Sequence, residues 1–126
     1  MMEITKSFGF DAAHTLQREI DADSSRRIHG HSYRAEIALR GRRDPETGMV
    51  MDMGQFERLL EATRDGLDHR FLDDIDGLGP GTLENLATWI WHQLEPDCVG
   101  LARVTVYRDS AFESCSYWGE TGDAQR

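Results

Sequence analysis

Positive charge, cysteine and long apolar runs are all scarce in this chain. Its 126 residues include 14 lysines and arginines against 23 aspartates and glutamates, which gives a formal net charge of −9. This balance argues against a general nucleic-acid binder, because phosphate backbones call for a basic surface. No apolar run approaches the ~20 residues that span a bilayer, and the N-terminal residues lack the apolar core of a signal peptide. We therefore expect no membrane segment and a cytoplasmic protein.

The two cysteines, Cys98 and Cys115, lie far apart and match neither a zinc nor a redox spacing, so a reducing compartment accounts for them. Hydrophobic residues make up 39% and charged residues 29% of the chain, which are the proportions of an ordinary globular domain. The length suits one hydrophobic core. We predict a single domain over residues 1–118 and a disordered tail over residues 119–126.

Hydrophobic periodicity predicts an α+β domain. Alternating residues indicate strands, at residues 3–10, 33–40, 49–51, 102–109 and 114–118. Residues 15–27 carry no pattern and are expected to form a loop. Helical spacing predicts one helix that Asp52 caps and that ends near Leu67, and a second that Thr82 caps and that ends before Pro96. The short connections favour an antiparallel sheet with both helices on one face.

Three histidines are the most informative residues. His29 and His31 are spaced i, i+2, and two such side chains point the same way only on an extended strand. With His14 from a neighbouring segment they could form a three-histidine site that leaves the fourth position of a tetrahedral zinc open, as in a catalytic centre. The alternative is that the histidines lie in the core or at strand ends, each with a single hydrogen bond and no metal.

Other charged positions admit both a chemical and a structural interpretation. Asp68 could orient His69 and stabilise its charged form, as in a proton shuttle, but the helix dipole also favours a histidine just past a helix C-terminus. Asp109 could bind a guanidine-like edge, such as that of a pterin or guanine, or it could be an ordinary turn residue. Arg26 and Arg27 could bind a small anion or lie in a solvated loop.

Taken together, these features resemble one family over about residues 4–118. The matching segments, in chain order, are Phe10–His14, Ile28–Tyr33, Gly48–Asp52, Leu67–His69, Thr82–Ala87 and Asp109–Tyr117. Their order and spacing are similar to those of the 6-pyruvoyltetrahydropterin synthase and 6-carboxytetrahydropterin synthase family. The resemblance implies the tunnelling fold, in which a four-stranded antiparallel sheet carries two helices and subunits join their sheet edges into a barrel.

The resemblance also implies a site and a reaction. The site residues that it implies are zinc ligands His14, His29 and His31, proton-relay residues Asp68 and His69, and substrate-binding residues Thr82 and Asp109. The implied substrate is 7,8-dihydroneopterin triphosphate, toward which zinc acts as a Lewis acid. Triphosphate leaves, and the usual bacterial product is 6-carboxytetrahydropterin, with acetaldehyde lost, on the route to 7-deazaguanine compounds such as queuosine. The implied assembly is a hexamer of two trimers with active sites between subunits.

The chain departs from the family at the position of the general base. The family usually has a cysteine four residues before the first histidine of the pair, where this chain has Ser25. A serine hydroxyl is several pKa units less acidic than a thiol, whose pKa is ~8.5, so it cannot act as a thiolate base. Asp23, the Asp68–His69 pair or zinc-bound water could compensate, or the chemistry differs.

A second departure concerns the family's pterin-binding glutamate, which lies eight residues before a tyrosine near the end. Counting back from Tyr117 reaches Asp109, a shorter carboxylate, and the preceding Arg108 could pair with it.

The leading hypothesis is a zinc-dependent lyase of the 6-carboxytetrahydropterin synthase type. A paralogue with different pterin side-chain chemistry, giving a 6-pyruvoyl product or retro-aldol cleavage only, is the second. A non-catalytic zinc- and pterin-binding protein is the third, because Ser25 replaces the usual cysteine.

Overall fold

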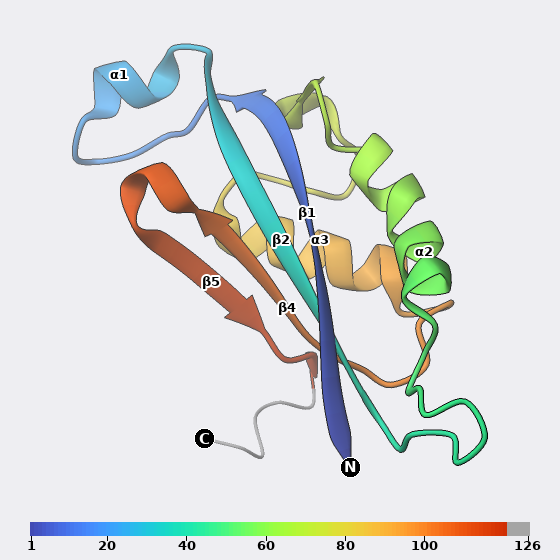
Figure 1. Cartoon of the computed structure of the whole chain (residues 1–126). Helices are drawn as coiled ribbons and strands as arrows, with labels where there is room; N and C mark the ends of the chain where they lie inside the picture. Colours follow the sequence, from blue (N-terminus) through green and yellow to red (C-terminus); the bar gives the residue numbers. More distant parts are fainter. Residues whose placement is uncertain (121–126) are drawn as a thin grey trace.

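The computed structural model describes residues 1–120, and these form a twisted sheet with two helices against one face (Figure 1). The strands are β1 (Met2–His14), β2 (His29–Gly41), β3 (Arg70–Phe71), β4 (Leu101–Arg108) and β5 (Glu113–Tyr117). The helices are α1 (Ala22–Arg26), α2 (Met53–Asp65) and α3 (Leu83–Leu94), and 3₁₀ turns lie at Leu72–Asp74 and Asp109–Ala111. The predicted α+β class is confirmed, with α2 and α3 on the same face.

The sheet has the strand order β3-β1-β2-β4-β5. Its four long strands are antiparallel to their neighbours, as predicted, whereas β3 runs parallel to β1. The register of β1 and β2 runs from Met2 opposite Gly41 to His14 opposite His29, and it also places Ala12 opposite His31. The pairing therefore brings the three histidines together at one end of the sheet.

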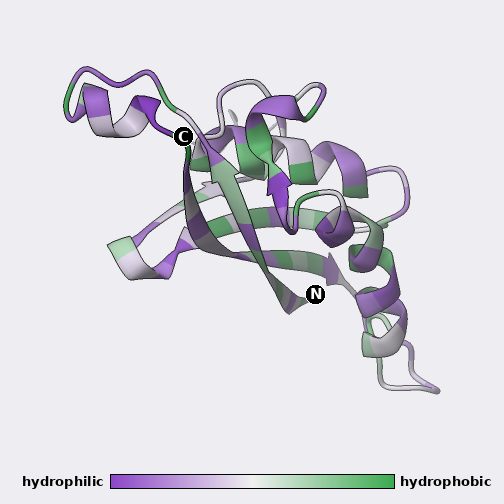
Figure 2. Cartoon of the chain, turned by 90° about the horizontal axis from the view of Figure 1, so that it is seen from above, coloured by the Kyte–Doolittle hydropathy of each residue, from purple (hydrophilic) through white to green (hydrophobic). Residues whose placement is uncertain are grey.

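The core fills the space between the sheet and α2 and α3. Alternate residues of the strands face it, and the hydropathy colouring alternates along the strands accordingly (Figure 2). The largest fully buried side chains are Phe56, Ile37, Leu39, Leu67, Leu72, Leu86, Ile90 and Leu94. Burial of each such side chain contributes about 1.5–3 kcal/mol. Both predicted helix caps are confirmed, because Asp52 accepts from the Gly54 N–H and Thr82 from the Asn85 N–H, each at 3.1 Å.

The prediction of a loop over residues 15–27 is wrong for Ala22–Arg26, which form α1. Asp21 precedes it in the left-handed region, and the Ser24 and Ser25 hydroxyls donate to the carbonyl oxygens of Asp21 and Ala22 at 3.0 Å. A five-residue helix with one buried side chain has no apolar periodicity that a sequence could display. This helix and the segment before it project from one end of the molecule (Figure 1).

Two strand predictions also need correction. Residues 49–51 form no strand, because β1 and β4 already occupy both sides of β2. The Met49 carbonyl instead accepts from the Asp44 N–H at 2.8 Å within the turn after β2. Conversely, β3 joins the free side of β1 through Arg70 and Phe71. A two-residue strand is too short for alternation to reveal it.

The predicted disordered tail falls mostly outside the described residues. Of residues 119–126, the structure describes Gly119 and Glu120, and the Tyr117 hydroxyl donates a hydrogen bond to the Glu120 carboxylate. The rest of the prediction concerns residues 121–126, which lie outside the described part. Within residues 1–120, no helix combines the length and the apolar character that crossing a membrane requires.

Gly100 precedes β4 and packs against the backbone of β2. Its φ of 83° lies in the left-handed region, and a Cβ atom there would overlap the carbonyl oxygen of Arg40. We expect Gly100→Ala to lower the free energy of unfolding by well over about 1 kcal/mol, because both the dihedral angle and the contact oppose it. Gly77→Ala is the matched control, since Gly77 has a φ of 80° and open space at its Cβ position. Urea unfolding of both variants separates the effect of the positive φ from that of the overlap with Arg40. Equal losses in the free energy of unfolding would show that the overlap has no effect.

Candidate metal centre

The three predicted histidines converge at the end of the sheet next to α1. His14 is the last residue of β1, and His29 and His31 lie at the start of β2. One ring nitrogen from each histidine lies within 4.8 Å of the other two. The ring centroids are 4.5 to 4.9 Å apart. The i, i+2 spacing on an extended strand therefore does place His29 and His31 on one face, as expected.

Backbone carbonyls fix the orientation of two of these rings. The Nδ1 atom of His14 lies 2.8 Å from the Gly81 carbonyl oxygen, and the Nδ1 atom of His29 lies 2.7 Å from the Arg27 carbonyl oxygen. An Nδ1–H that donates to a carbonyl leaves the lone pair on Nε2. The Nε2 atoms of His14 and His31 are buried and have no hydrogen-bond partner among the described residues. Three converging imidazoles, two of them with the second nitrogen bound to a carbonyl, suit a zinc ion with an open coordination position.

The local environment keeps His14 and His31 in the form that binds metal. Burial lowers the pKa of His31 to about 4, and the nearby positive charge of Arg108 acts in the same direction. Burial also lowers the pKa of His14, partly offset by the hydrogen bond to Gly81. Both side chains are therefore neutral at pH 7, and a metal need not displace protons from them.

A cavity of about 710 Å³ opens beside the cluster and reaches His14. Its size is that of a small-molecule site, roughly 300–1,000 Å³. The residues that line it come from the loop after β1, the start of α3 and the ends of β4 and β5. They include Tyr33 from β2, Thr82 at the N-terminus of α3, Arg108 at the end of β4 and Glu113 at the start of β5. The predicted substrate residue Thr82 thus does line the cavity.

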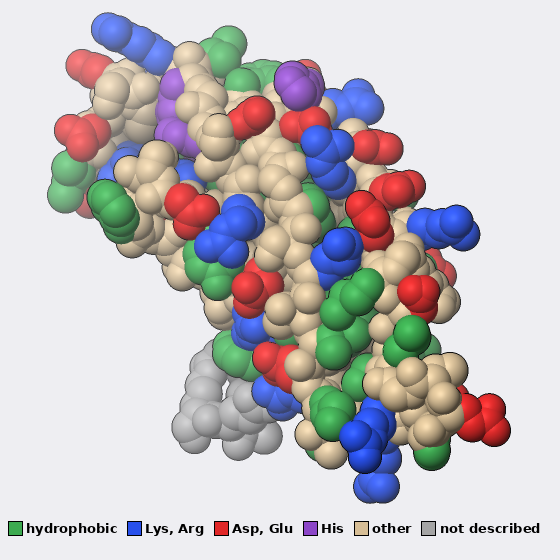
Figure 3. All heavy atoms as spheres, in the orientation of Figure 1, with side chains coloured by type: hydrophobic (Ala, Val, Ile, Leu, Met, Phe, Trp, Pro, Cys, Tyr) green, Lys and Arg blue, Asp and Glu red, His purple; other side chains and the backbone are tan. Residues whose placement is uncertain are grey.

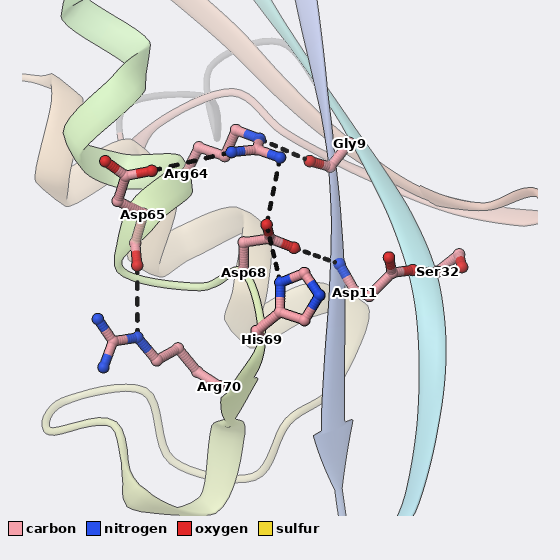
Figure 4. Close-up of polar contacts among 8 residues, drawn as sticks. All are labelled: Gly9, Asp11, Ser32, Arg64, Asp65, Asp68, His69 and Arg70. Carbon is pink, nitrogen blue, oxygen red and sulfur yellow. Dashed lines mark hydrogen bonds and ion pairs between the residues drawn. The ribbon is translucent and has the colours of Figure 1, made fainter.

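The Asp68–His69 pair forms a second cluster at the outer edge of β1 (Figure 4). One Asp68 oxygen accepts from the Asp11 N–H at 2.9 Å, and the other lies 3.1 Å from His69 Nδ1 and 3.2 Å from the Arg64 guanidinium. The Asp11 hydrogen bond, with help from His69 and Arg64, holds the pKa of Asp68 below its usual value. His69 has a φ of 58°, and its N–H donates to the Asp11 carbonyl at 2.7 Å.

The two clusters are separate but share a surface hollow. Histidine side chains surface in two places near the end of the molecule where α1 lies (Figure 3). The cavity beside His14 is not lined by Asp68 or His69, whereas an open hollow along β1, β2 and β3 is lined by both His31 and His69. The His69 side chain is 80% exposed. The geometry therefore places this imidazole at the surface, free to approach a ligand or another subunit.

The predicted site residues Ser25 and Asp109 also do not line the cavity. The Ser25 side chain is buried within α1, where its hydroxyl donates to the Ala22 carbonyl. The Asp109 carboxylate pairs with Arg34 at 3.1 Å, rather than with Arg108, and both side chains are largely exposed. Catalytic or substrate-binding parts for Ser25 and Asp109 stay predictions.

Sequence reasoning missed Tyr33, Arg108 and Glu113 as cavity residues. Tyr33 looked like one more apolar position of β2, and Arg108 was noted only as a neighbour of Asp109. Arg108 instead pairs across the strands with Glu113, at 3.2 Å. The only available signal was the strand parity that Tyr33 shares with His31, which places both on the same face.

Gly81 leaves room for the candidate metal centre because it has no side chain. Its carbonyl oxygen orients His14, and a Cβ atom at this position would lie 3.1 Å from Nδ1 of the same ring. We expect Gly81→Ala to displace the His14 ring and to weaken metal binding by about 10- to 100-fold, the usual effect of disturbing a partner of a metal ligand. Competitive zinc titration measures the change, with Gly77→Ala as the control. An unchanged zinc affinity would show that the ring adapts.

Comparison with known proteins gives consistent matches. A family model described as 6-pyruvoyl tetrahydropterin synthase matches residues 3–120. The chain is 39% identical over 100 residues to a 6-carboxy-5,6,7,8-tetrahydropterin synthase of Synechocystis, covering 75% of this chain and 76% of that protein. It is 30% identical over 107 residues to 6-pyruvoyl tetrahydrobiopterin synthase of Homo sapiens, covering 74% of each. The solved structure of Caenorhabditis elegans 6-pyruvoyl tetrahydropterin synthase superposes with a TM-score of 0.81 at 27% identity, covering 94% of this chain and 96% of that one. This likeness confirms the expected tunnelling fold.

Proposed function

The chain belongs to the 6-pyruvoyl tetrahydropterin synthase family, and we propose that it is a zinc-dependent lyase that converts 7,8-dihydroneopterin triphosphate to 6-carboxytetrahydropterin. The observation that carries the proposal is the three-histidine cluster, in which the Nε2 atoms of His14 and His31 are buried and have no partner within residues 1–120. The 39% identity to a protein named for the 6-carboxy product favours that product over the 6-pyruvoyl one. The product would feed the synthesis of 7-deazaguanine compounds such as queuosine.

Each group of residues has a distinct part in the proposed mechanism. Zinc, held by His14, His29 and His31, would supply Lewis acidity toward the side-chain oxygens of the substrate. The Gly81 and Arg27 carbonyls keep the ligand nitrogens of His14 and His29 aimed at one point.

Proton transfer would fall to the second cluster and substrate contact to the cavity. The Asp68 carboxylate orients the exposed His69 imidazole, which would take up and return a proton. Thr82, which begins α3 and lines the cavity, would contact the substrate, as the family resemblance suggests. Asp109 would contact it only after leaving its ion pair with Arg34.

The proposed assembly is a hexamer of two trimers. The sheet is open in the single chain, with β3 at one edge and β5 at the other, and a small sheet with open edges gains stability by pairing them. Phe112, in the turn before β5, is 96% exposed and would gain burial in such a contact. Multi-angle light scattering measures the subunit number. We retain the cytoplasm as the expected location, which fits two cysteines that are both free thiols.

The deciding experiment incubates the zinc-loaded protein with 7,8-dihydroneopterin triphosphate and identifies the products by mass spectrometry. We expect acetaldehyde and 6-carboxytetrahydropterin in equal amounts. A different pterin product would identify the chain as a paralogue with other side-chain chemistry. Tight binding with unchanged substrate would identify it as a zinc- and pterin-binding protein, the alternative that the serine at position 25 supports.

Ser25→Cys tests whether the missing thiol limits turnover. Because the Ser25 hydroxyl is buried in α1 and bonded to the Ala22 carbonyl, we expect the substitution to change kcat by less than about tenfold. Product formation under saturating substrate measures the effect, and Ser24→Cys, one residue earlier and exposed, is the control. A larger gain in Ser25→Cys alone would place residue 25 in the reaction.

A further inference from the structure

Two hydrogen-bond donors in the cavity have no acceptor. The Tyr33 hydroxyl is buried in a residue only 4% exposed, and Arg108 Nε is likewise buried. Neither atom has a hydrogen-bond partner in the part of the chain that the structure describes. Both residues line the cavity that reaches His14. A buried polar group without a partner costs free energy, so a pair of them in a cavity points to a ligand that satisfies both.

The strand register places the two donors side by side. Arg34 of β2 pairs with Tyr107 of β4, so Tyr33 and Arg108 occupy the next position along the same antiparallel pair. Side chains at such opposing positions lie on one face of the sheet and close together. The Tyr33 ring also contacts the His31 ring, with centroids 5.8 Å apart. The donors are therefore adjacent to the histidine cluster.

The chemistry of the two groups selects an acceptor that carries negative charge. A guanidinium is always protonated, and an ordinary tyrosine hydroxyl keeps its proton at neutral pH, so both groups are donors. Glu113 lies 3.2 Å from one terminal nitrogen of Arg108, whereas Nε has no partner in the described part of the chain. The carboxylate predicted to bind a guanidine-like edge, Asp109, is paired with Arg34 instead. Apart from the Glu113 carboxylate, which one terminal nitrogen of Arg108 already engages, this corner of the cavity offers donors.

We propose that Arg108 and Tyr33 together form a receptor for one oxyanion, a carboxylate or phosphate group of the small molecule that binds beside the histidine cluster. The inference rests on the proposed function for the identity of that molecule as a pterin. It adds a specificity rule: the preferred pterin carries an anionic group, and Arg108 and Tyr33 recognise that group rather than the ring.

The test compares ligands that differ only in the anion. Pterin-6-carboxylate, unsubstituted pterin and inorganic triphosphate are titrated into the native protein and into Arg108→Met and Tyr33→Phe, followed by pterin fluorescence or calorimetry. Each titration is done with and without zinc, so that binding through the metal is separated from binding through the receptor. Circular dichroism checks the fold of each variant. Arg40→Met, which removes an arginine paired with Glu3 near the other end of β2, is the matched control.

We expect both variants to bind pterin-6-carboxylate or triphosphate about 10- to 100-fold more weakly, in the absence of zinc as well, with pterin affinity unchanged. If the variants lose affinity for pterin-6-carboxylate alone, the site is a carboxylate receptor. If they lose affinity for triphosphate alone, it is a phosphate receptor. Tyr33→Phe removes a buried hydroxyl that has no partner among the described residues, so without ligand it should leave the Tm unchanged or raise it.

Three outcomes distinguish this inference from the proposed function. If both variants bind pterin and pterin-6-carboxylate equally more weakly, Arg108 and Tyr33 contact the pterin ring. That result would overturn the proposed anion receptor. Unchanged affinity for every anion in both variants also overturns it and leaves the pterin function standing. Binding of triphosphate that depends on Arg108, in a protein that binds no pterin, would support the receptor and overturn the proposed function.

Discussion

Replacement of His31 by alanine is expected to abolish stoichiometric zinc binding and, with it, all turnover of a pterin substrate. His31 contributes a buried Nε2 atom that has no other partner among the described residues. The two remaining histidines would leave two positions of a tetrahedral ion to water. The zinc affinity should fall by more than the about 10- to 100-fold that is usual when a hydrogen-bond partner of a metal ligand is changed.

Metal analysis after dialysis against a competing chelator measures the effect of His31→Ala. The matched control is His92→Ala, which removes an exposed histidine on α3 outside the cluster and should retain one zinc per chain. A second readout is thermal unfolding. Zinc should raise the Tm of the native protein and of the control, but not that of His31→Ala, because an ion stabilises only the state that binds it. Full zinc occupancy in His31→Ala would contradict the ligand assignment.

The candidate metal centre could be predicted because its signal is local. Two histidines at i, i+2 must share a face once the chain is extended, and the apolar alternation from Tyr33 to Leu39 shows that it is extended there. The caps of α2 and α3 could be predicted for the same reason, since Asp52 and Thr82 act within their own helical turn.

The remaining parts of the site depend on contacts between distant segments. Nothing near Gly81 in sequence shows that its carbonyl orients His14, 67 positions away. Whether Asp109 is free or paired depends on Arg34, which the register of β2 and β4 brings beside it. The Tyr33 hydroxyl has no partner among residues 1–120, and this depends on all the segments that pack around the cavity, since the same hydroxyl at a sheet edge would reach water. Strand parity predicts the face of the sheet on which Tyr33 lies, but only the packed structure shows that its hydroxyl has no hydrogen-bond partner among the described residues.

Replacement of Asp68 by asparagine is expected to lower kcat by about 10²- to 10⁴-fold while leaving zinc content unchanged, which is the range for loss of a positioned proton-transfer group. The Asp68 carboxylate accepts from the Asp11 N–H and lies within 3.1 to 3.2 Å of His69 Nδ1 and the Arg64 guanidinium. Asparagine retains one acceptor oxygen but not the charge that stabilises a protonated His69. Steady-state kinetics at saturating zinc measures the change.

Asp65→Asn is the matched control for Asp68→Asn, because the Asp65 carboxylate lies 3.8 Å from the same Arg64 and its side chain is 75% exposed. We expect this control to keep its kcat, since exposed ion pairs contribute little. An equal loss of kcat in both variants would indicate that turnover depends on the negative charge near Arg64 rather than on the Asp68–His69 pair.

Acid unfolding gives an independent check on the role of Asp68. The Asp11 hydrogen bond, together with His69 and Arg64, lowers the pKa of this carboxyl in the folded chain below its usual value. A lowered folded pKa contributes stability that is fully present above the unfolded value and is lost as the pH falls through the folded one. The native protein and Asp68→Asn should therefore differ in their free energy of unfolding by a constant amount near neutral pH. This difference, the stability gap, should become smaller below about pH 4. A gap that persists unchanged at lower pH would show that asparagine acts through packing, and the loss of kcat could then no longer be assigned to the missing charge.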